Sequence, residues 1–233
     1  MTFTGKRALV TGAGSGIGAA VARRLAREGA EVIVADLSPE AVAKELGARA
    51  IVLDVRDEGQ VAPAMADLDV LVNAAGIGST TNAPETPLEV WENVMAVNAR
   101  GTFLCCKHAI PGMVARGGGS IVNFASIAGL VGLRNRAAYS ASKGAVISLT
   151  RALAIDHVAD GIRVNAVAPG TVDSPWVRRL VEDVGESLDA LRARQPMGRL
   201  GTPEEIADAV AFLASAEFVT GSVLVIDGGL TAA

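Results

Sequence analysis

Short apolar segments rich in Val, Ile and Ala alternate with longer amphipathic segments along almost the whole chain. Short apolar runs of this kind are typical of parallel strands buried on both faces, and apolar residues spaced three and four apart are typical of helices. Strands that alternate with helices are joined by crossover connections, which predict a parallel sheet. We therefore expect an α/β fold with seven strands and with helices on both faces of the sheet.

Glycine, proline and helix-capping residues indicate where these elements begin and end. The expected strands are Arg7–Thr11, Glu31–Asp36, Ile51–Asp54, Asp69–Asn73, Ser120–Ala125, Ile162–Ala168 and Val223–Asp227. The expected helices are Gly16–Glu28, one that begins at Ser38 and Pro39, a short one before Asp69, one or two within Pro87–Arg116, Tyr139–Ala159, and one from the capping box at Thr202 to Ser215. Residues 171–201, which include Gly185, are irregular, and such insertions are usually functional. Residues 1–233 show no linker, so we expect one domain.

Composition narrows the class of protein. The 233 residues carry a net charge of −4 without a basic block, which argues against a nucleic-acid partner. The apolar runs are too short to span a membrane, and Met1 to Arg7 lacks the apolar core of a signal peptide, so we expect a cytoplasmic protein. Cys105 and Cys106 are adjacent and lack further ligands, so we expect buried thiols and no metal site.

The segment from Thr11 to Gly18, with glycines at 12, 14, 16 and 18, joins the first strand to the first helix. Glycines allow the backbone to approach a pyrophosphate, and a helix N-terminus offers free N–H groups and partial positive charge. Asp36 ends the second strand, where a carboxylate can bind the ribose hydroxyls of NAD and repel the 2′-phosphate of NADP. Ser15 and Leu37 offer no basic side chain to offset that repulsion. These features predict a Rossmann-type, doubly wound NAD-binding fold.

The spacing of these glycines resembles that of the short-chain dehydrogenase/reductase family, and the resemblance extends over the whole chain. Its further motifs are Asn73-Ala74-Ala75-Gly76, Pro169-Gly170-Thr171-Val172 and Asp227-Gly228-Gly229. Ser174 stands where the family usually has Thr and keeps the hydroxyl. The resemblance implies a cofactor site formed by Gly12, Ser15, Gly16, Ile17, Gly18, Asp36, Asp54, Val55, Asn73, Ala74, Gly76, Tyr139, Lys143, Pro169, Gly170, Val172 and Ser174.

Tyr139 and Lys143 stand four residues apart on one expected helix face. Hydride transfer at a carbon that bears oxygen requires a proton transfer at that oxygen, and a nearby ammonium favours the phenolate of a tyrosine whose pKa is ordinarily about 10. Tyr139 is the only tyrosine in the sequence. The resemblance adds two partners: Ser126, which binds the substrate oxygen, and Asn98, which orients Lys143 through water. We therefore predict an NAD-dependent oxidoreductase that acts on a secondary alcohol or ketone.

Arginines in the two variable segments bear on the substrate. A subset of the family, which includes cytosolic-type 3-hydroxybutyrate and deoxy sugar acid dehydrogenases, binds a carboxylate at the positions of Arg136 and Arg194, which implies a hydroxy acid or sugar acid. A third arginine of that subset falls on Leu180, beside Arg178 and Arg179. Surface charge is the plainer interpretation of most of these arginines. The family also implies a homotetramer that pairs the helices within Pro87–Arg116 and Tyr139–Ala159.

Two alternatives remain open at this point. A regulator that binds NAD without turnover would have no need of Tyr139 and Lys143. An NADP-dependent carbonyl or 3-oxoacyl reductase would share most of the motifs but would not favour Asp36. A nucleotide-sugar epimerase or dehydratase is not expected, because these longer relatives carry an added C-terminal substrate domain.

Overall fold

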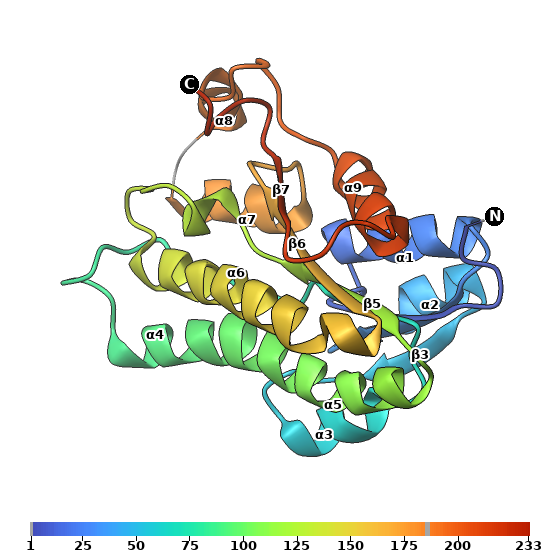
Figure 1. The fold of residues 1–233 in the computed structure, drawn as a ribbon. Helices are drawn as coiled ribbons and strands as arrows, with labels where there is room; N and C mark the ends of the chain where they lie inside the picture. The colour runs from blue at the N-terminus through green and yellow to red at the C-terminus, as the bar shows by residue number, and fades with distance from the viewer. Residues whose placement is uncertain (1, 185–186) are drawn as a thin grey trace.

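The computed structural model describes residues 2–184 and 187–233, and over these residues seven parallel strands form one sheet (Figure 1). The strand order is β3-β2-β1-β4-β5-β6-β7. The strands are β1 (Arg7–Thr11), β2 (Glu31–Asp36), β3 (Arg49–Val52), β4 (Val70–Asn73), β5 (Gly119–Phe124), β6 (Ile162–Pro169) and β7 (Val223–Ile226). The expected doubly wound, Rossmann-type sheet is confirmed.

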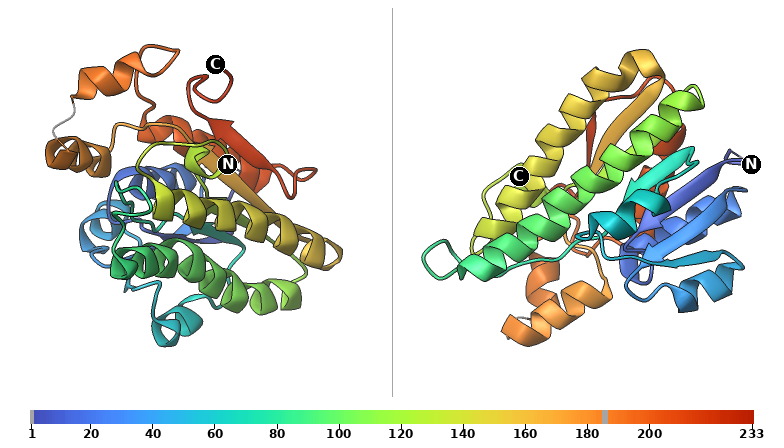
Figure 2. Two further views of the ribbon diagram at one scale, coloured as in Figure 1. Left: turned by 90° about the vertical axis from the view of Figure 1, so that its left-hand side faces the viewer. Right: turned by 90° about the horizontal axis from the view of Figure 1, so that it is seen from below.

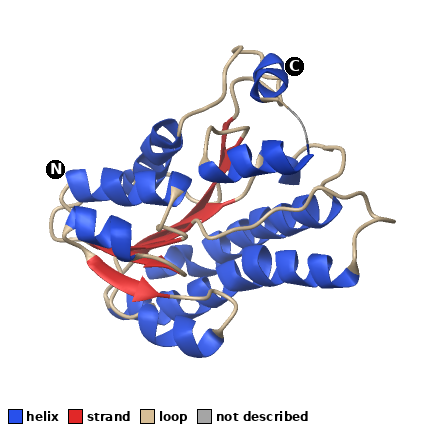
Figure 3. Cartoon of the chain, turned by 180° about the vertical axis from the view of Figure 1, so that it is seen from behind, coloured by secondary structure: helices blue, strands red, loops and turns tan. Residues whose placement is uncertain are grey.

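Alternate residues of the central strands point to opposite faces of the sheet and build two hydrophobic layers. Ala8 and Val10 of β1 pack with α1 (Gly16–Arg27), α2 (Glu40–Leu46) and α9 (Pro203–Ser215). Leu9 points to the other face, toward α3 (Glu58–Ala64) and α5 (Thr102–Ala115). Figures 2 and 3 show these two groups of helices on opposite sides of the strands. Burial on both faces explains why the strands are nearly continuous apolar runs.

One long helical segment follows β4 and runs beside α6 (Ala137–His157) in both views of Figure 2. It consists of α4 (Leu88–Met95), a π-helical turn η1 (Ala96–Gly101) and α5. The expectation of one or two helices within Pro87–Arg116 is thus met by a helix with an internal irregularity. Two 3-10 turns, η2 (Ile127–Gly129) and η3 (Val158–Asp160), flank α6.

Several expected boundaries shift by one or two residues, and those of strand β3 and helix α2 have a clear physical reason. Strand β3 ends at Val52, two residues before the predicted end, because it is an edge strand with mostly exposed side chains, and hydrophobicity therefore does not mark its limits. Helix α2 has Pro39 at its N-cap and not Ser38. The N–H of Ser38 instead donates to Asp36 Oδ1 at 3.0 Å, which places Ser38 in the turn that follows β2.

The insertion between β6 and α9 carries two short helices, α7 (Pro175–Val184) and α8 (Leu188–Ala193). Its two ends are held together, because Val172 and Gly201 form an isolated parallel bridge. Gly185, which the sequence placed in this segment, lies outside the described residues. Among the helices of the described ranges, none combines the length and the apolar character that crossing a membrane requires.

Candidate cofactor and active site

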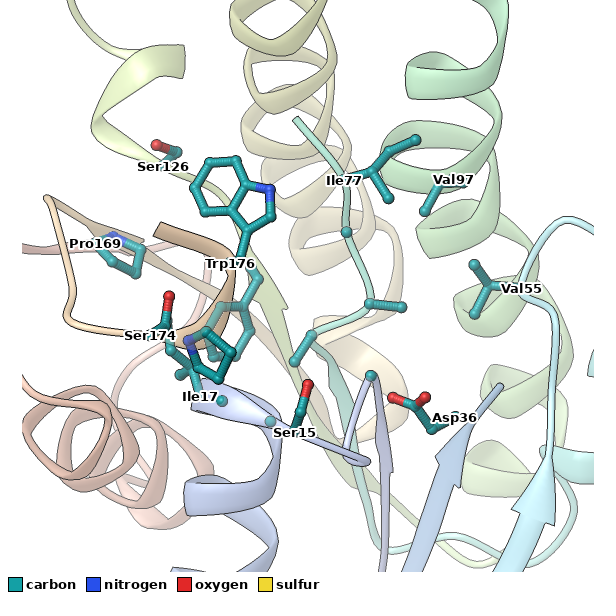
Figure 4. Close-up of a pocket in the computed structure, with 18 of the residues that line it drawn as sticks. Ser15, Ile17, Asp36, Val55, Ile77, Val97, Ser126, Pro169, Ser174 and Trp176 are labelled. Carbon is teal, nitrogen blue, oxygen red and sulfur yellow. The ribbon is translucent and has the colours of Figure 1, made fainter. Parts of the chain in front are cut away.

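A cleft of about 630 Å³ lies at the carboxyl ends of the strands, around the point where β1 and β4 run side by side (Figure 4). This is where the connections change direction, and such switch points are where doubly wound sheets bind ligands. Most of the predicted site residues line it: Gly12, Ser15, Gly16, Ile17, Gly18, Asp36, Asp54, Val55, Ala74, Gly76, Ser126, Tyr139, Lys143, Pro169, Gly170, Val172 and Ser174.

The glycine turn is shaped by a close approach of two loops. Gly12 has a φ of +66°, and a Cβ there would lie 2.7 Å from the backbone of Ala75. Thr11 fixes this approach, because its Oγ1 accepts hydrogen bonds from the N–H groups of Ala74 and Ala75 at 3.1 and 3.2 Å. The parallel pairing of β1 with β4 brings the two loops together, so that position 12 has no space for a Cβ and the Thr11 hydroxyl reaches the loop after β4.

The N-terminus of α1 opens into this cleft. Its N-cap residue, Ser15, makes no side-chain capping bond, so the hydroxyl does not satisfy the first N–H groups of the helix. Those N–H groups and the helix dipole together favour an anion. A pyrophosphate group therefore fits the glycine turn.

Asp36 lies at the opposite wall of the glycine turn. Its carboxylate accepts from the N–H of Gly14 at 2.9 Å and from that of Ser38 at 3.0 Å. A Cβ on Gly14 would approach the Asp36 carboxyl carbon to 2.7 Å, so a side chain at Gly14 would displace this group. The carboxylate is thereby fixed at the end of β2 with one edge toward the cleft, as binding of ribose hydroxyls requires.

Asp54 is tied to its neighbour Arg56. The guanidinium donates to both carboxylate oxygens of Asp54, at 2.7 Å for the shortest pair, and also to Asn93 Oδ1 at 2.9 Å. Hydrogen bonding from Arg56 lowers the pKa of Asp54, so this carboxylate stays charged. Arg56 thus links the loop after β3 to α4 at the end of the cleft near Asp36 and Leu37.

The residues predicted to transfer the proton lie at the other end of the cleft. Tyr139 in the first turn of α6 lies next to Ser126, which follows β5 and whose side chain acts to lower the pKa of the phenol. Lys143 Nζ lies 5.7 Å from the centre of the Tyr139 ring and donates to the carbonyl of Phe124 at 2.7 Å. The structure therefore brings these three residues together as the sequence predicted.

Asn98 lies behind these residues, in the π-helical turn. Its side chain exchanges two hydrogen bonds of 2.8 Å with the backbone of Ile77 and donates to Ser142 Oγ at 2.9 Å. A Cβ on Gly76 would lie 3.3 Å from Asn98 Oδ1 and 3.5 Å from Lys143 Nζ, so the three residues converge. Asn98 itself does not line the cleft. It holds the loop after β4 against α6.

Burial governs the electrostatics of the pair. Desolvation raises the pKa of Tyr139, and the nearby Ser126 side chain and the charge of Arg136 oppose this rise. Desolvation also lowers the pKa of Lys143 to about 8. Burial therefore works against the expected stabilisation of the phenolate by Lys143, because it disfavours the charged form of both groups. A cation placed in the cleft would act on Tyr139 in the opposite direction.

Three other predicted residues lie away from the cleft surface. Asn73 is buried beneath the sheet end, where its amide donates to Asn123 Oδ1 at 2.9 Å. Arg136 precedes α6 and is half-buried, and the charges that act on its pKa are those of Tyr139 and Arg194. Arg136 is therefore within electrostatic reach of both Tyr139 and Arg194.

The cleft also contains residues that the sequence argument did not select, among them Leu37, Ile77, Val97, Trp176 and Arg179. Arg179 faces the cleft, whereas Arg178 pairs with Asp173 at 2.8 Å. Ile77 and Val97 carry no motif that marks them. Trp176 could have been found, since it is an aromatic residue within the segment 171–201 that the sequence marks as functional.

The fold, the glycine turn and the Ser-Tyr-Lys group define an oxidoreductase of the short-chain dehydrogenase/reductase family, and the chain belongs to that family. Residues 12–231 match the sequence profile of a family described as Enoyl-(Acyl carrier protein) reductase. Cis-4-hydroxycyclohexanecarboxylate dehydrogenase of Sinomonas cyclohexanicum is 48% identical over 99% of this chain and 98% of that protein. Meso-2,3-butanediol dehydrogenase of Serratia marcescens is 39% identical over 100% and 97%.

Solved structures agree with these relatives. A structure from Beutenbergia cavernae, described as an NAD(P)-dependent gluconate 5-dehydrogenase with bound NADP at low occupancy, superposes with a TM-score of 0.93. It is 40% identical and covers 99% of this chain and 98% of its own. The chain is therefore an oxidoreductase that works with a nicotinamide cofactor.

Proposed function

We propose that this enzyme oxidises a secondary alcohol, or reduces the corresponding ketone, with NAD. The convergence of Ser126, Tyr139 and Lys143 at one end of a cleft that has Asp36 at its other end carries this proposal. When bound, NAD would supply the acceptor for the hydride from the carbinol carbon. Tyr139 takes the hydroxyl proton in the same step, the Ser126 hydroxyl holds the substrate oxygen, and Lys143 and Asn98 support the tyrosine.

The preference for NAD over NADP rests on the fixed position of Asp36. Its carboxylate would repel a 2′-phosphate, and Arg56, a basic residue of the cleft, is engaged with Asp54 and Asn93. Asp36→Ala should weaken NAD binding and reduce the ratio of kcat/KM for NAD to that for NADP. A wild-type enzyme that favours NADP would show that it is instead an NADP-dependent reductase.

We further propose that the substrate carries a carboxylate, held by Arg136 and Arg194. Support comes from the charge of Arg136, which acts on Tyr139, from the proximity of Arg194 to Arg136, and from the relative named for a hydroxycyclohexanecarboxylate. Among the side chains that the structure describes, no carboxylate forms an ion pair with Arg136. The substrate is therefore a hydroxy acid whose carbinol lies beside Tyr139.

Formation of NADH with hydroxy acids and with neutral alcohols of matched size tests this proposal. Arg136→Ala and Arg194→Ala should raise KM much more for the acids than for the alcohols. Loss of a buried charged contact costs about 2–5 kcal/mol. Equal effects on the two substrate types would contradict the assignment. Absence of turnover with every substrate, together with intact NAD binding, would favour the NAD-binding regulator.

The remaining proposals concern the whole protein. We propose that residues 1–233 act as one cofactor-binding and catalytic domain, with 171–201 covering the substrate. A cytoplasmic location is supported by the free, buried thiols of Cys105 and Cys106. Assembly as a homotetramer is supported by the exposed apolar side chains on α4 to α6.

A further inference from the structure

Trp176 lines the cleft but has no role in the proposed cofactor binding or proton transfer. It stands in the first turn of α7, and its ring centre lies 6.1 Å from that of Tyr139 with an angle of 31° between the ring planes. Figure 4 shows its indole between Ser126 on one side and Ile77 on the other. The largest aromatic side chain of the cleft therefore borders the space beside the reacting group.

The indole is seated on Gly78. A Cβ at Gly78 would collide with Trp176 Cζ2 and would lie 3.2 and 3.3 Å from Cη2 and Cε2. The backbone of Gly78 is not in the left-handed region, so its conformation permits a side chain. The indole alone accounts for the lack of space at this position, and the loop after β4 supports the ring from behind.

The first turn of α7 is held in place from three directions. Ser174 Oγ accepts from the N–H of Val177 at 3.3 Å, and Asp173 pairs with Arg178 at 2.8 Å. Val177 is buried in a small cluster with Leu191 and Leu200. These contacts fix the first turn of α7, and Trp176 lines the cleft from that turn.

We propose that Trp176 is a specificity-determining residue that limits the length of the substrate beyond its carbinol carbon. An indole packed on Gly78 narrows the space beside Tyr139, which then accepts a short or cyclic hydrocarbon body and excludes a long alkyl chain. Closely packed walls do not yield to extra methylene groups at low cost. The proposal rests on the proposed alcohol oxidation but not on the carboxylate or on the choice between NAD and NADP.

The test is a chain-length series measured as kcat/KM. The acids are 3-hydroxybutanoate, 3-hydroxyhexanoate and 3-hydroxyoctanoate, and the neutral counterparts are 2-butanol, 2-hexanol and 2-octanol. The wild type should favour the shortest member, and Trp176→Ala should raise the long-to-short ratio about tenfold or more, since one methylene at a tight wall is worth roughly 10–200-fold. Affinity for the cofactor should stay unchanged. An unchanged long-to-short ratio in Trp176→Ala would overturn the proposal.

Two further variants separate a wall from a general structural role. Gly78→Ala should displace the indole and lower kcat/KM for the short substrates, whereas the double variant Gly78→Ala/Trp176→Ala should behave like Trp176→Ala alone. Such non-additivity is the signature of a direct contact. If the effects of the two substitutions on kcat/KM were additive, the proposed contact between Trp176 and Gly78 would be wrong.

Trp91→Ala is the matched control. Trp91 and Trp176 are both 38% exposed, but Trp91 lies on α4 outside the cleft, so its loss should leave the long-to-short ratio unchanged. A shift equal to that of Trp176→Ala would overturn the proposal. The neutral alcohols separate the proposed role of Trp176 from the proposed carboxylate on the substrate. Turnover of the alcohols without turnover of the acids would contradict the carboxylate proposal and would still test Trp176. Absence of turnover with the acids and with the alcohols would overturn both the alcohol oxidation and the role of Trp176.

Discussion

Tyr139 has no substitute within this chain, because the sequence contains a single tyrosine. Tyr139→Phe removes the phenolic oxygen and keeps the ring beside Trp176, so folding and NAD binding should survive. General acid/base catalysis contributes about 10²–10⁴-fold, and kcat should fall by at least that factor. Single-turnover kinetics with NAD already bound measure the hydride and proton transfer apart from NAD binding and product release. Near wild-type turnover would show that another group moves the proton.

Lys143 makes the stability of the protein without cofactor depend on pH. Burial lowers its pKa from an ordinary 10.5 to about 8, so the folded state binds fewer protons than the unfolded state between these values. The free energy of unfolding should therefore rise with pH across this window, by on the order of 3 kcal/mol. Below about pH 8, the buried ammonium of Lys143 lowers the free energy of unfolding by this amount.

Lys143→Met supplies the comparison for this effect, since it keeps the length of the side chain and cannot titrate. Urea unfolding of both proteins from pH 7 to 11 should show a difference that disappears as the pH rises through 8 to 10.5. A constant difference would mean that Lys143 keeps its ordinary pKa.

At the scale of elements, the 3-10 turn η2 sets the distance between Ser126 and α6. A Cβ on Gly129 would lie 2.7 Å from the Lys143 carbonyl carbon and 2.8 Å from Gly144 N. Gly129→Ala should push η2 away from α6, lengthen the contact between Ser126 and Tyr139, and lower kcat with little change in NAD affinity. Gly132→Ala is the control, because a Cβ there meets nothing within 4 Å. Equal activity of the two variants would contradict this account.

The limits of sequence-based prediction are also clearest for elements. Strands β1 and β2 and the capping box of α9 were predicted to the residue, since burial on both faces and the Thr202–Glu205 pair leave local signals. The π-helical turn at Ala96–Gly101 leaves no such signal, although it carries Asn98. The contact between Trp176 and Gly78 also leaves no local signal, because it joins helix α7 to the loop after β4, far away in the sequence. Motifs therefore predict the residues of the cofactor site and of proton transfer, whereas the packing around them, which shapes the rest of the cleft, leaves no motif.

At the scale of the whole molecule, the face formed by α4 to α6 differs from an ordinary surface. A broad groove of about 910 Å³ there is lined by several apolar residues: Trp91, Met95, Phe103, Ala145 and Leu149. Ala145 and Ala152 are accessible small residues on α6 that permit close approach of a second helix, whereas Ala154 is fully buried in the core and cannot serve in this way. Exposed apolar patches of this kind mark interaction sites.

The expected homotetramer gives the last prediction. Phe103 is 45% exposed in this groove, so Phe103→Glu would place a charge at the centre of a contact between two copies. Light scattering at micromolar concentration should report four chains for the wild type and fewer for Phe103→Glu, because an unpaired charge in an apolar contact is costly. Val52→Glu, which adds the same charge at the edge strand β3, should leave the assembly intact. A monomeric wild type, or identical masses for wild type and Phe103→Glu, would show that this face does not join subunits.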